Sequence, residues 1–209
     1  PIRELSFDEA AELAYFGAKI LHPSTIHPCR EKGIPVLLKN TLNPTDQGTR
    51  ITSSYRANGI RAVASKDGIT AIRIKSLRML MDYGFLKRVF DVFAQQRTAV
   101  DLITTSEVAI TLTVDDTSNL SKITEELREF SSVEVTHNHS IICIVGDFVA
   151  EKPGIASQVF NAIKHIPIGL ISYGGSSHNI SILVSSSHKQ AALMALQTVV
   201  STEVTIEQH

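Results

Sequence analysis

Hydrophobic and polar positions repeat with two different periods along this chain. Residues 6–22 place apolar side chains at helical spacing behind Ser6, and Glu9 stands three residues further on, as in a capping box. The stretch 108–114 instead alternates apolar and polar residues, which is typical of a half-buried strand. The chain therefore contains both helices and strands, and it is predicted to be a mixed fold.

The segment that opens with this helix is predicted to be α/β. A short helix over 24–33, a strand over 34–40 and a loop over 43–49 follow the first helix. The polar, small-residue run 53–59 has no periodicity, and it predicts a linker. About 60 residues thus precede a change in organisation.

Beyond this run the chain repeats itself with a period of about 70 residues. Residues 84–103 align with 154–171: a glycine opens each stretch, Val-Phe recurs inside it and Leu-Ile closes it. Each copy reads as strand, helix, strand, strand, helix, strand, which predicts two βαββαβ units of the α+β, ferredoxin-like class. The expected elements are 69–76, 84–96, 99–105, 107–114, 120–130 and 133–138 in the first copy, and 140–147, 154–165, 168–173, 178–185, 188–200 and 203–207 in the second.

The two copies differ where the third element turns into the fourth. Asp101 of copy one corresponds to Gly169 of copy two, and the run TTSE corresponds to the longer SYGGSSHN, which has no acid. An aspartate inside an apolar strand costs stability unless it is paired or solvated, so a copy-specific Asp101 indicates a binding role. The alternative is an aspartate at a sheet edge that faces water.

The first helix of each copy starts at a glycine, Gly84 in copy one. Free backbone N–H groups at a helix start favour an anion such as a carboxylate. Together with Asp101 and Glu107, copy one therefore suits a zwitterion, whose carboxylate would lie on the helix start and whose ammonium groups would lie on the acids. Gly84 could equally serve only to cap a tight strand-to-helix turn.

Composition excludes several classes of partner. Among 209 residues, 20 Lys and Arg balance 21 Asp and Glu, so neither nucleic acid nor an anionic membrane is an expected partner. No apolar run reaches the length of a membrane span, and 43% hydrophobic residues can form ordinary cores.

Cys29 and Cys143 lie far apart, which favours a reducing, cytoplasmic location. Because the chain begins at Pro1, we expect it to be part of a longer protein.

Three stretches carry a resemblance to one family. Residues 6–51, and above all ELAYFGAKILHP, resemble the end of the amino-acid-kinase domain of an aspartokinase; VDLITTSEV and SYGGSSHNISILV resemble its regulatory region. The resemblance covers essentially the whole chain and is strongest to the lysine-sensitive, monofunctional type. It implies the end of a kinase domain over 1–52, a linker with the first regulatory strand over 53–68, and ACT domains over 69–137 and 138–209.

The same resemblance implies L-lysine as a feedback inhibitor and a homodimer that pairs through the ACT domains. The family's effector contacts fall on the start of the first helix of copy one and on the strand and turn after it. Asp82 departs from the family pattern, which often has Ser there, and its charge favours a cationic ligand. The implied effector residues are Met79, Asp82, Gly84, Phe85, Leu86, Ala99, Val100, Asp101, Thr105, Ser106 and Glu107.

The resemblance implies a complete enzyme that uses ATP and Mg²⁺ to phosphorylate L-aspartate, but this chain lacks the family's Lys-Phe-Gly-Gly segment. We therefore expect the chain alone to be inactive, with no catalytic residue, no metal and no cofactor of its own. Lys39 and Asn40 are implied to border the nucleotide; the alternative for Lys39 is a solvated lysine at a strand end.

Several histidines are weaker candidates. His137 and His139 share one face of an extended segment but have no third ligand nearby in sequence, so a turn between domains is the favoured interpretation. His178 is expected to be structural, at a domain contact. An amino-acid-sensing module without a kinase remains the alternative function, and the kinase-like first 50 residues argue against it.

Overall fold

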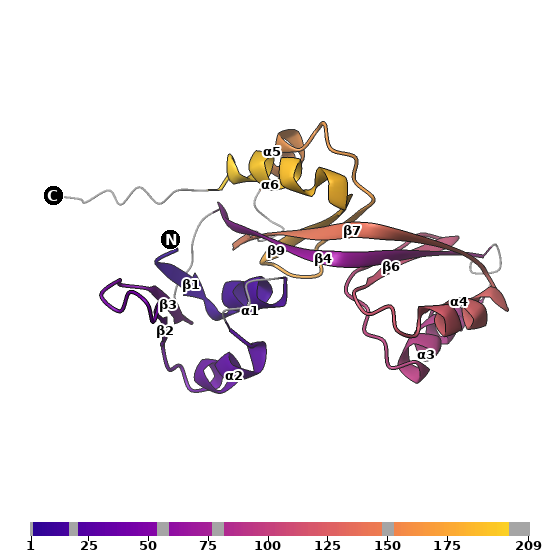
Figure 1. The fold of residues 1–209 in the computed structure, drawn as a ribbon, viewed down its shortest axis with the longest axis horizontal. Coiled ribbons are helices and arrows are strands. Elements are labelled where there is room, and N and C mark those ends of the chain that lie inside the picture. The colour runs from indigo at the N-terminus through magenta and orange to yellow at the C-terminus, as the bar shows by residue number, and fades with distance from the viewer. Residues whose placement is uncertain (1, 17–20, 54–58, 77–81, 148–152, 201–209) are drawn as a thin grey trace.

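The computed structural model describes residues 2–16, 21–53, 59–76, 82–147 and 153–200. An N-terminal segment with its own small sheet lies beside a larger, strongly twisted sheet that carries the remaining helices (Figure 1). The predicted mixture of helices and strands, an α/β segment followed by two α+β copies, is confirmed; among the described residues copy one is βαββαβ and copy two is βαββα. The strand expected over 203–207 lies outside the described residues.

The N-terminal segment is built from three short strands and two helices. Its elements are β1 (Glu4–Ser6), α1 (Phe7–Tyr15), α2 (Pro23–Glu31), β2 (Val36–Leu38) and β3 (Thr49–Thr52). β3 lies in the middle, parallel to β1 and antiparallel to β2. The predicted capping box is present, since Ser6 Oγ accepts from the Glu9 N–H at 3.1 Å and Glu9 Oε2 accepts from the Ser6 N–H at 2.8 Å. This reciprocal pairing sets where α1 begins.

The larger sheet has six strands in the order β5-β6-β4-β7-β9-β8. Neighbouring strands in it are antiparallel. Its strands are β4 (Gly59–Lys75), β5 (Ile103–Thr105), β6 (Ala109–Val114), β7 (Ser132–Asp147), β8 (Leu170–Tyr173) and β9 (Asn179–Ser185). Its helices are α3 (Phe85–Gln95), α4 (Leu120–Arg128), α5 (Ile155–Ala162) and α6 (Lys189–Gln197), with a short 3₁₀ turn, η2 (Ser186–His188), before α6.

The two copies share their long central strands. The second half of β4, residues 69–75, pairs with β6 and with the first half of β7, as copy one requires. The first half of β4, residues 59–66, pairs with 141–147 of β7 and fills the place of a fourth strand in copy two. Gly59, predicted as the end of a linker, is therefore already a strand residue. Residues 54–58 of that predicted linker lie outside the described part of the chain.

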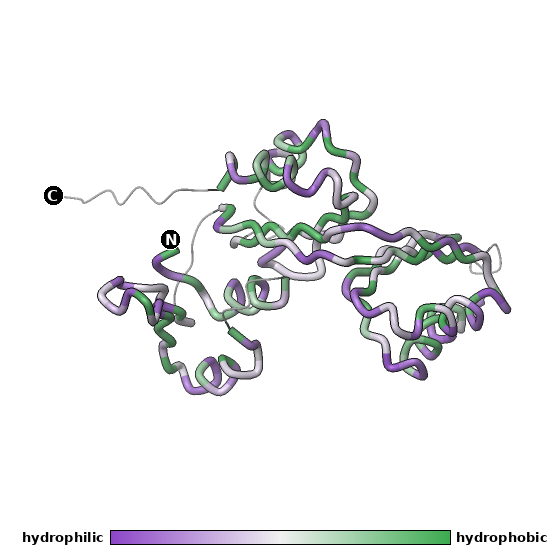
Figure 2. Tube along the Cα trace, viewed as in Figure 1, coloured by the Kyte–Doolittle hydropathy of each residue, from purple (hydrophilic) through white to green (hydrophobic). Residues whose placement is uncertain are grey.

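The shared strand β7 is buried on both faces in its second half. Ile142 and Ile144 face the core of copy two beneath α5 and α6, while Ile141, Cys143 and Val145 face α1. Side chains alternate between the faces of a strand, so a continuous apolar run predicts this double burial. Figure 2 shows this part of the sheet largely in the colour of hydrophobic residues. Helices α5 and α6 cover one face of the copy-two sheet, and helix α1 therefore covers the opposite face.

The helices of the two copies lie on opposite sides of the shared sheet (Figure 1). Copy one has its own core, which lies between helices α3 and α4 and the face of β4 and β6 that these helices cover. Phe85, Ile110 and Leu127 are among its buried side chains. This arrangement leaves the 99–102 segment of copy one next to α1. Among the described residues, no helix is both long enough and apolar enough to cross a membrane.

Candidate functional site

Asp101 lies in the segment between α3 and β5, two residues before β5. Its backbone N–H donates to Thr113 O at 2.9 Å, which fixes the segment against β6. Its side chain is only 2% exposed, and Oδ1 accepts hydrogen bonds from Lys66 Nζ at 2.7 Å and from the Tyr15 hydroxyl at 3.4 Å. The aspartate is thus buried and paired, so the alternative of an aspartate that simply faces water does not describe it.

Lys66 bridges two carboxylates. Its Nζ lies 2.7 Å from Asp101 Oδ1 and 2.8 Å from Asp115 Oδ2, and it stands over the ring of Tyr15, 5.2 Å from the ring centroid. We call these four residues, Tyr15, Lys66, Asp101 and Asp115, the junction cluster. Two carboxylates and one ammonium give it a formal charge of −1. Asp101 Oδ2 is buried and has no hydrogen-bond partner among the described residues.

Burial dominates the ionisation of Asp101. Desolvation raises the pKa of this carboxyl above its ordinary value, although the ammonium of Lys66 opposes the shift. Burial by itself would lower the pKa of Lys66, but its hydrogen bonds to Asp101 and Asp115 outweigh burial and raise it. Burial and the neighbouring Asp101 carboxylate also raise the pKa of Tyr15. One additional cation beside Asp101 would therefore favour its ionised form.

The start of α3 provides the other half of the predicted site. The Gly84 N–H donates to Asp82 Oδ1 at 3.0 Å, and the Phe85 N–H donates to Asp82 O at 3.1 Å. The backbone of Gly84 has φ −97°, so the turn does not require glycine for its geometry. Phe85 is buried in the core of copy one, whereas Leu86 is exposed. Helix geometry leaves the next N–H groups of the first turn without intrahelical acceptors.

The turn after β5 lies at the same end of copy one as the loop to α3. Thr105, Ser106 and Glu107 are exposed, and the Ser106 N–H donates to Ala109 O at 2.8 Å to close the turn. The Ser76 N–H donates to Val108 O at 3.1 Å, which ties this turn to the end of β4. Met79, which the family resemblance implied as a contact, lies outside the described residues.

One chain does not bring all the predicted effector residues together. Asp101 and Ser106 are five positions apart with β5 between them, which in extended backbone corresponds to about 16 Å at 3.3 Å per residue. Ala99 is exposed beside Asp101, and Val100 packs against the core of copy one. Asp101, Ala99 and Val100 thus form one group, and the α3 start with the turn at Glu107 forms a second.

Lys39 and Asn40 follow β2 and border an open hollow of about 430 Å³. Lys39 Nζ donates to Pro44 O at 3.3 Å, and Asn40 Oδ1 accepts from the Leu42 N–H at 3.0 Å. Asp46 and the backbone around Gly48 also line this hollow. Among the described residues, no group of three or more His, Cys, Asp or Glu side chains could hold a metal ion.

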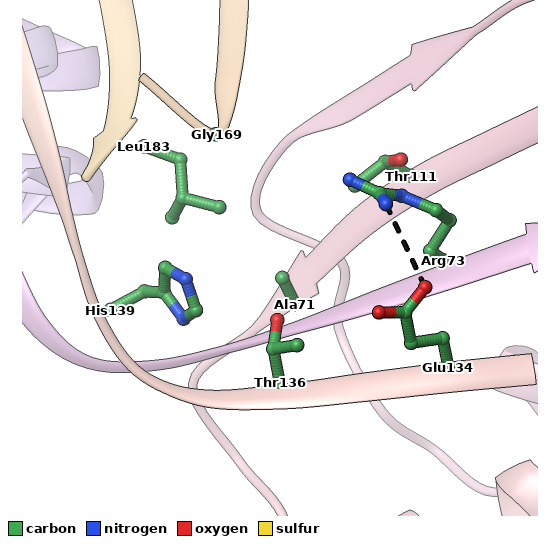
Figure 3. A pocket seen from close by; sticks show the side chains of 8 residues that line it. All are labelled: Ala71, Arg73, Thr111, Glu134, Thr136, His139, Gly169 and Leu183. Atoms are coloured by element: carbon green, nitrogen blue, oxygen red, sulfur yellow. Dashed lines mark ion pairs between the residues drawn. The ribbon is translucent and has the colours of Figure 1, made fainter. Parts of the chain in front are cut away.

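Two of the histidine candidates make contacts within the described part of the chain. His137 Nδ1 pairs with Thr70 Oγ1 at 3.0 Å, and His178 Nε2 lies 3.7 Å from Asp8 Oδ2 on α1. The expectation of a domain contact for His178 is therefore met. Figure 3 shows His139 in a small hollow of about 60 Å³ with the Arg73–Glu134 ion pair beside it.

The residues that the sequence did not single out are those that link segments far apart in the chain. Tyr15, Lys66 and Asp115 surround Asp101, and Glu12 of α1 accepts hydrogen bonds from Ser176 and Asn179 of copy two. Each lies in an ordinary helix, strand or turn pattern, so no local motif marks it. The comparison of the two copies and the family resemblance both pointed to Asp101, around which the cluster is built.

Comparisons with known proteins agree with this architecture. A model of the "Amino acid kinase family" matches residues 1–40, and a model of an "ACT domain" matches residues 142–199. A solved domain described as a C-terminal regulatory domain of aspartate kinase from Porphyromonas gingivalis is 40% identical, with a TM-score of 0.62. The match covers 68% of this chain and 97% of that domain. The chain belongs to the aspartokinase family.

Longer aspartokinases match nearly the whole chain. Aspartokinase 3, chloroplastic, of Arabidopsis thaliana is 38% identical over 95% of this chain and 38% of its own length. Lysine-sensitive aspartokinase 3 of Escherichia coli is 34% identical over 94% of this chain and 46% of its own length. The E. coli aspartokinase III structure with lysine and aspartate has a TM-score of 0.83 at 34% identity, covering 96% of this chain and 46% of that one. The chain thus spans less than half the length of these relatives.

Proposed function

We propose that this chain is the regulatory part of an aspartate kinase and that it binds L-lysine as a feedback inhibitor. The complete enzyme would transfer the γ-phosphate of ATP, with Mg²⁺, to the β-carboxylate of L-aspartate. The observation that carries the effector proposal is the buried, incompletely neutralised Asp101 in copy one, at a position where copy two has Gly169. The E. coli relative crystallised with lysine supports the choice of ligand.

The separation of the two groups of effector residues supports a site formed by two copies of the chain. β5 is an end strand of the described sheet. Antiparallel pairing of two β5 strands across a twofold axis near Thr104 would bring Asp101 of one copy opposite the Glu107 turn of the other. The lysine carboxylate would then lie on the free N–H groups at the start of α3, and its ammonium groups would lie on Asp101, with Glu107 or Asp82 assisting.

Regulation requires that lysine bind one arrangement of the kinase domain better than another. The contacts between α1 and the two copies are a physical route for this preference. Helix α1 packs on the shared sheet, and the hydroxyl of its Tyr15 donates a hydrogen bond to Asp101.

Lys39 and Asn40 would border the nucleotide in the complete enzyme. Two free cysteines favour a reducing compartment such as the cytoplasm. The balanced net charge of −1 gives no reason to expect a nucleic acid partner.

Calorimetric titration with L-lysine and L-norleucine tests the effector proposal. Norleucine keeps the carbon chain and the α-amino acid groups but lacks the side-chain ammonium, so it should bind at least about tenfold more weakly. Light scattering on the same samples should show a mass at least twice the 22.8 kDa of one chain. Absence of lysine binding at millimolar concentration would contradict the effector proposal, and a monomer with and without lysine would contradict the shared site.

A further inference from the structure

The turn between β8 and β9 of copy two, residues 174–178, contacts a carboxylate of helix α1. Ser176 Oγ donates to Glu12 Oε1 at 2.8 Å, and Asn179 Nδ2, at the start of β9, donates to Glu12 Oε2 at 2.5 Å. Each oxygen of the carboxylate thus has its own donor. Both donors are neutral, so the two bonds recognise the shape of a carboxylate and not only its charge.

The turn positions these donors through its own hydrogen bonds. The His178 N–H donates to Ser176 Oγ at 3.1 Å, which leaves the hydroxyl hydrogen of Ser176 free to donate to Glu12. The Gly146 N–H donates to His178 O at 3.0 Å and fixes the turn to β7. Gly174 has φ +96°, a backbone conformation that favours glycine. Copy two itself therefore holds the donors in place.

Helix α1 directs two carboxylates toward this turn. Asp8 and Glu12 are four residues apart, so they lie one turn apart on the same side of the helix. Asp8 Oδ2 lies 3.7 Å from His178 Nε2, and Asp8 Oδ1 lies 2.7 Å from Arg30 Nη1. Asp8 is thus paired with its arginine on α2, and Glu12 is the carboxylate that receives both donors of the turn.

A hollow of about 270 Å³ adjoins the bound carboxylate. It lies between α1 and copy two, and Glu12, Ser172, Ser176 and Asn179 are among the residues that line it. Glu12→Ala would remove the γ-carbon and the carboxylate, which together have the size of an acetate ion. The hydroxyl of Ser176 and the amide of Asn179 would then lose this acceptor beside a space that a small ion can enter. Hydrogen bonds to an ionised acceptor are stronger than neutral ones, so these donors would favour a free carboxylate.

We propose that the β8–β9 turn of copy two is a carboxylate-binding site that the chain fills with its own Glu12. The tethered carboxylate is present at a high effective concentration, so it excludes free amino acids and organic acids from this site. Because Glu12 belongs to α1, the occupied site also attaches α1 to copy two. The repeat places this turn where copy one has its exposed TTSE turn, so copy two has an internal ligand while copy one stays open.

Replacement of the missing carboxylate by acetate tests the site. Relative to sodium chloride, sodium acetate at about 200 mM should lower the unfolding equilibrium constant of Glu12→Ala at least about threefold more than that of the parent. Urea unfolding measures both constants, and the comparison with the parent removes the general effect of acetate as a salt. Glu31→Ala, which removes a mostly exposed carboxylate from α2, should respond like the parent. Adding Ser176→Ala to Glu12→Ala should abolish the response.

The outcomes of this titration do not depend on lysine, so a failure of the lysine proposal leaves them unchanged. A Glu12→Ala variant that folds in acetate but not in chloride would support the site. An acetate response that is equal in Glu12→Ala and in the parent would overturn it. If Glu12→Ala is unfolded in both salts, an exchange of donor and acceptor between Glu12 and Asn179 decides the matter.

Hydrogen exchange at pH 8, measured by mass spectrometry, follows this exchange of partners and tests the attachment of α1. Asn179→Asp places a second carboxylate against Glu12, so it should accelerate amide exchange in residues 7–15. Adding Glu12→Gln supplies an amide that can donate to the new carboxylate, and it should restore slow exchange. Exchange in residues 7–15 that Asn179→Asp leaves unchanged, or that the added Glu12→Gln does not restore, would overturn the inference.

Discussion

Ser176 Oγ donates to Glu12 Oε1 across 2.8 Å and so joins the turn between β8 and β9 of copy two to helix α1. Asn179 donates to the other oxygen of the same carboxylate. This turn corresponds in the repeat to the TTSE turn of copy one, where effector residues are predicted. The longer turn of copy two therefore holds a carboxylate from the chain itself, while copy one keeps its own turn exposed.

Replacing Glu12 with Gln should lower the free energy of unfolding by about 1 to 2 kcal/mol. Glutamine has no negative charge and only one acceptor oxygen, so the two charge-assisted hydrogen bonds from Ser176 and Asn179 would be replaced by weaker neutral ones. Urea unfolding measures the effect. Glu31→Gln, which changes a mostly exposed carboxylate on α2, is the control and should have little effect. Equal stability of both variants would show that the turn does not hold α1.

The helices, the repeat and most strands follow from periodicity, because each buries one face against a neighbouring layer. The extent of β4 does not follow from local pattern. The run 53–59 predicts a linker, but its last residue, Gly59, already begins β4, because β7 offers residues 59–66 a pairing edge along 141–147. Pairing of this kind depends on residues about 80 positions away, which no local window contains.

Substitution of Ile60 tests the assignment of this strand to copy two. Its side chain is 1% exposed and packs in the core beneath α5 and α6. Ile60→Ala should destabilise the protein by about 2 to 5 kcal/mol, the cost of a cavity in a core. Ile34→Ala, which removes a half-exposed side chain, should cost far less. A difference below about 0.5 kcal/mol between these variants in chemical unfolding would contradict the shared-strand arrangement.

The two cysteines should differ sharply in reactivity. Cys143 is fully buried in β7, and desolvation raises the pKa of its thiol to about 12, so the reactive thiolate is scarce at pH 8. Cys29 on α2 is partly exposed. A disulfide-exchange reagent should modify one thiol rapidly in the folded chain and the second only after denaturation. Rapid modification of Cys29→Ser would contradict the burial of Cys143.

The candidate site could be predicted only in part. Asp101, the start of α3 and the turn after β5 could be predicted, because the two copies differ at Asp101 and at this turn, a glycine precedes the helix and the family resemblance falls on the same segments. Lys66, Asp115 and Tyr15 could not be found this way, because each is an ordinary residue of its own segment. They become partners of Asp101 only when β4 and α1 pack beside it.

Calorimetric titration of L-lysine into Asp101→Ala tests the central claim most directly. Loss of a buried charge partner typically costs about 2 to 5 kcal/mol, so the affinity should fall roughly 30-fold or more. Gly169→Ala changes the equivalent position of copy two, where the added Cβ would meet Leu183 at an ordinary 3.6 Å, and it should bind lysine like the parent. Parent-like affinity in Asp101→Ala would contradict the account and place the lysine site elsewhere.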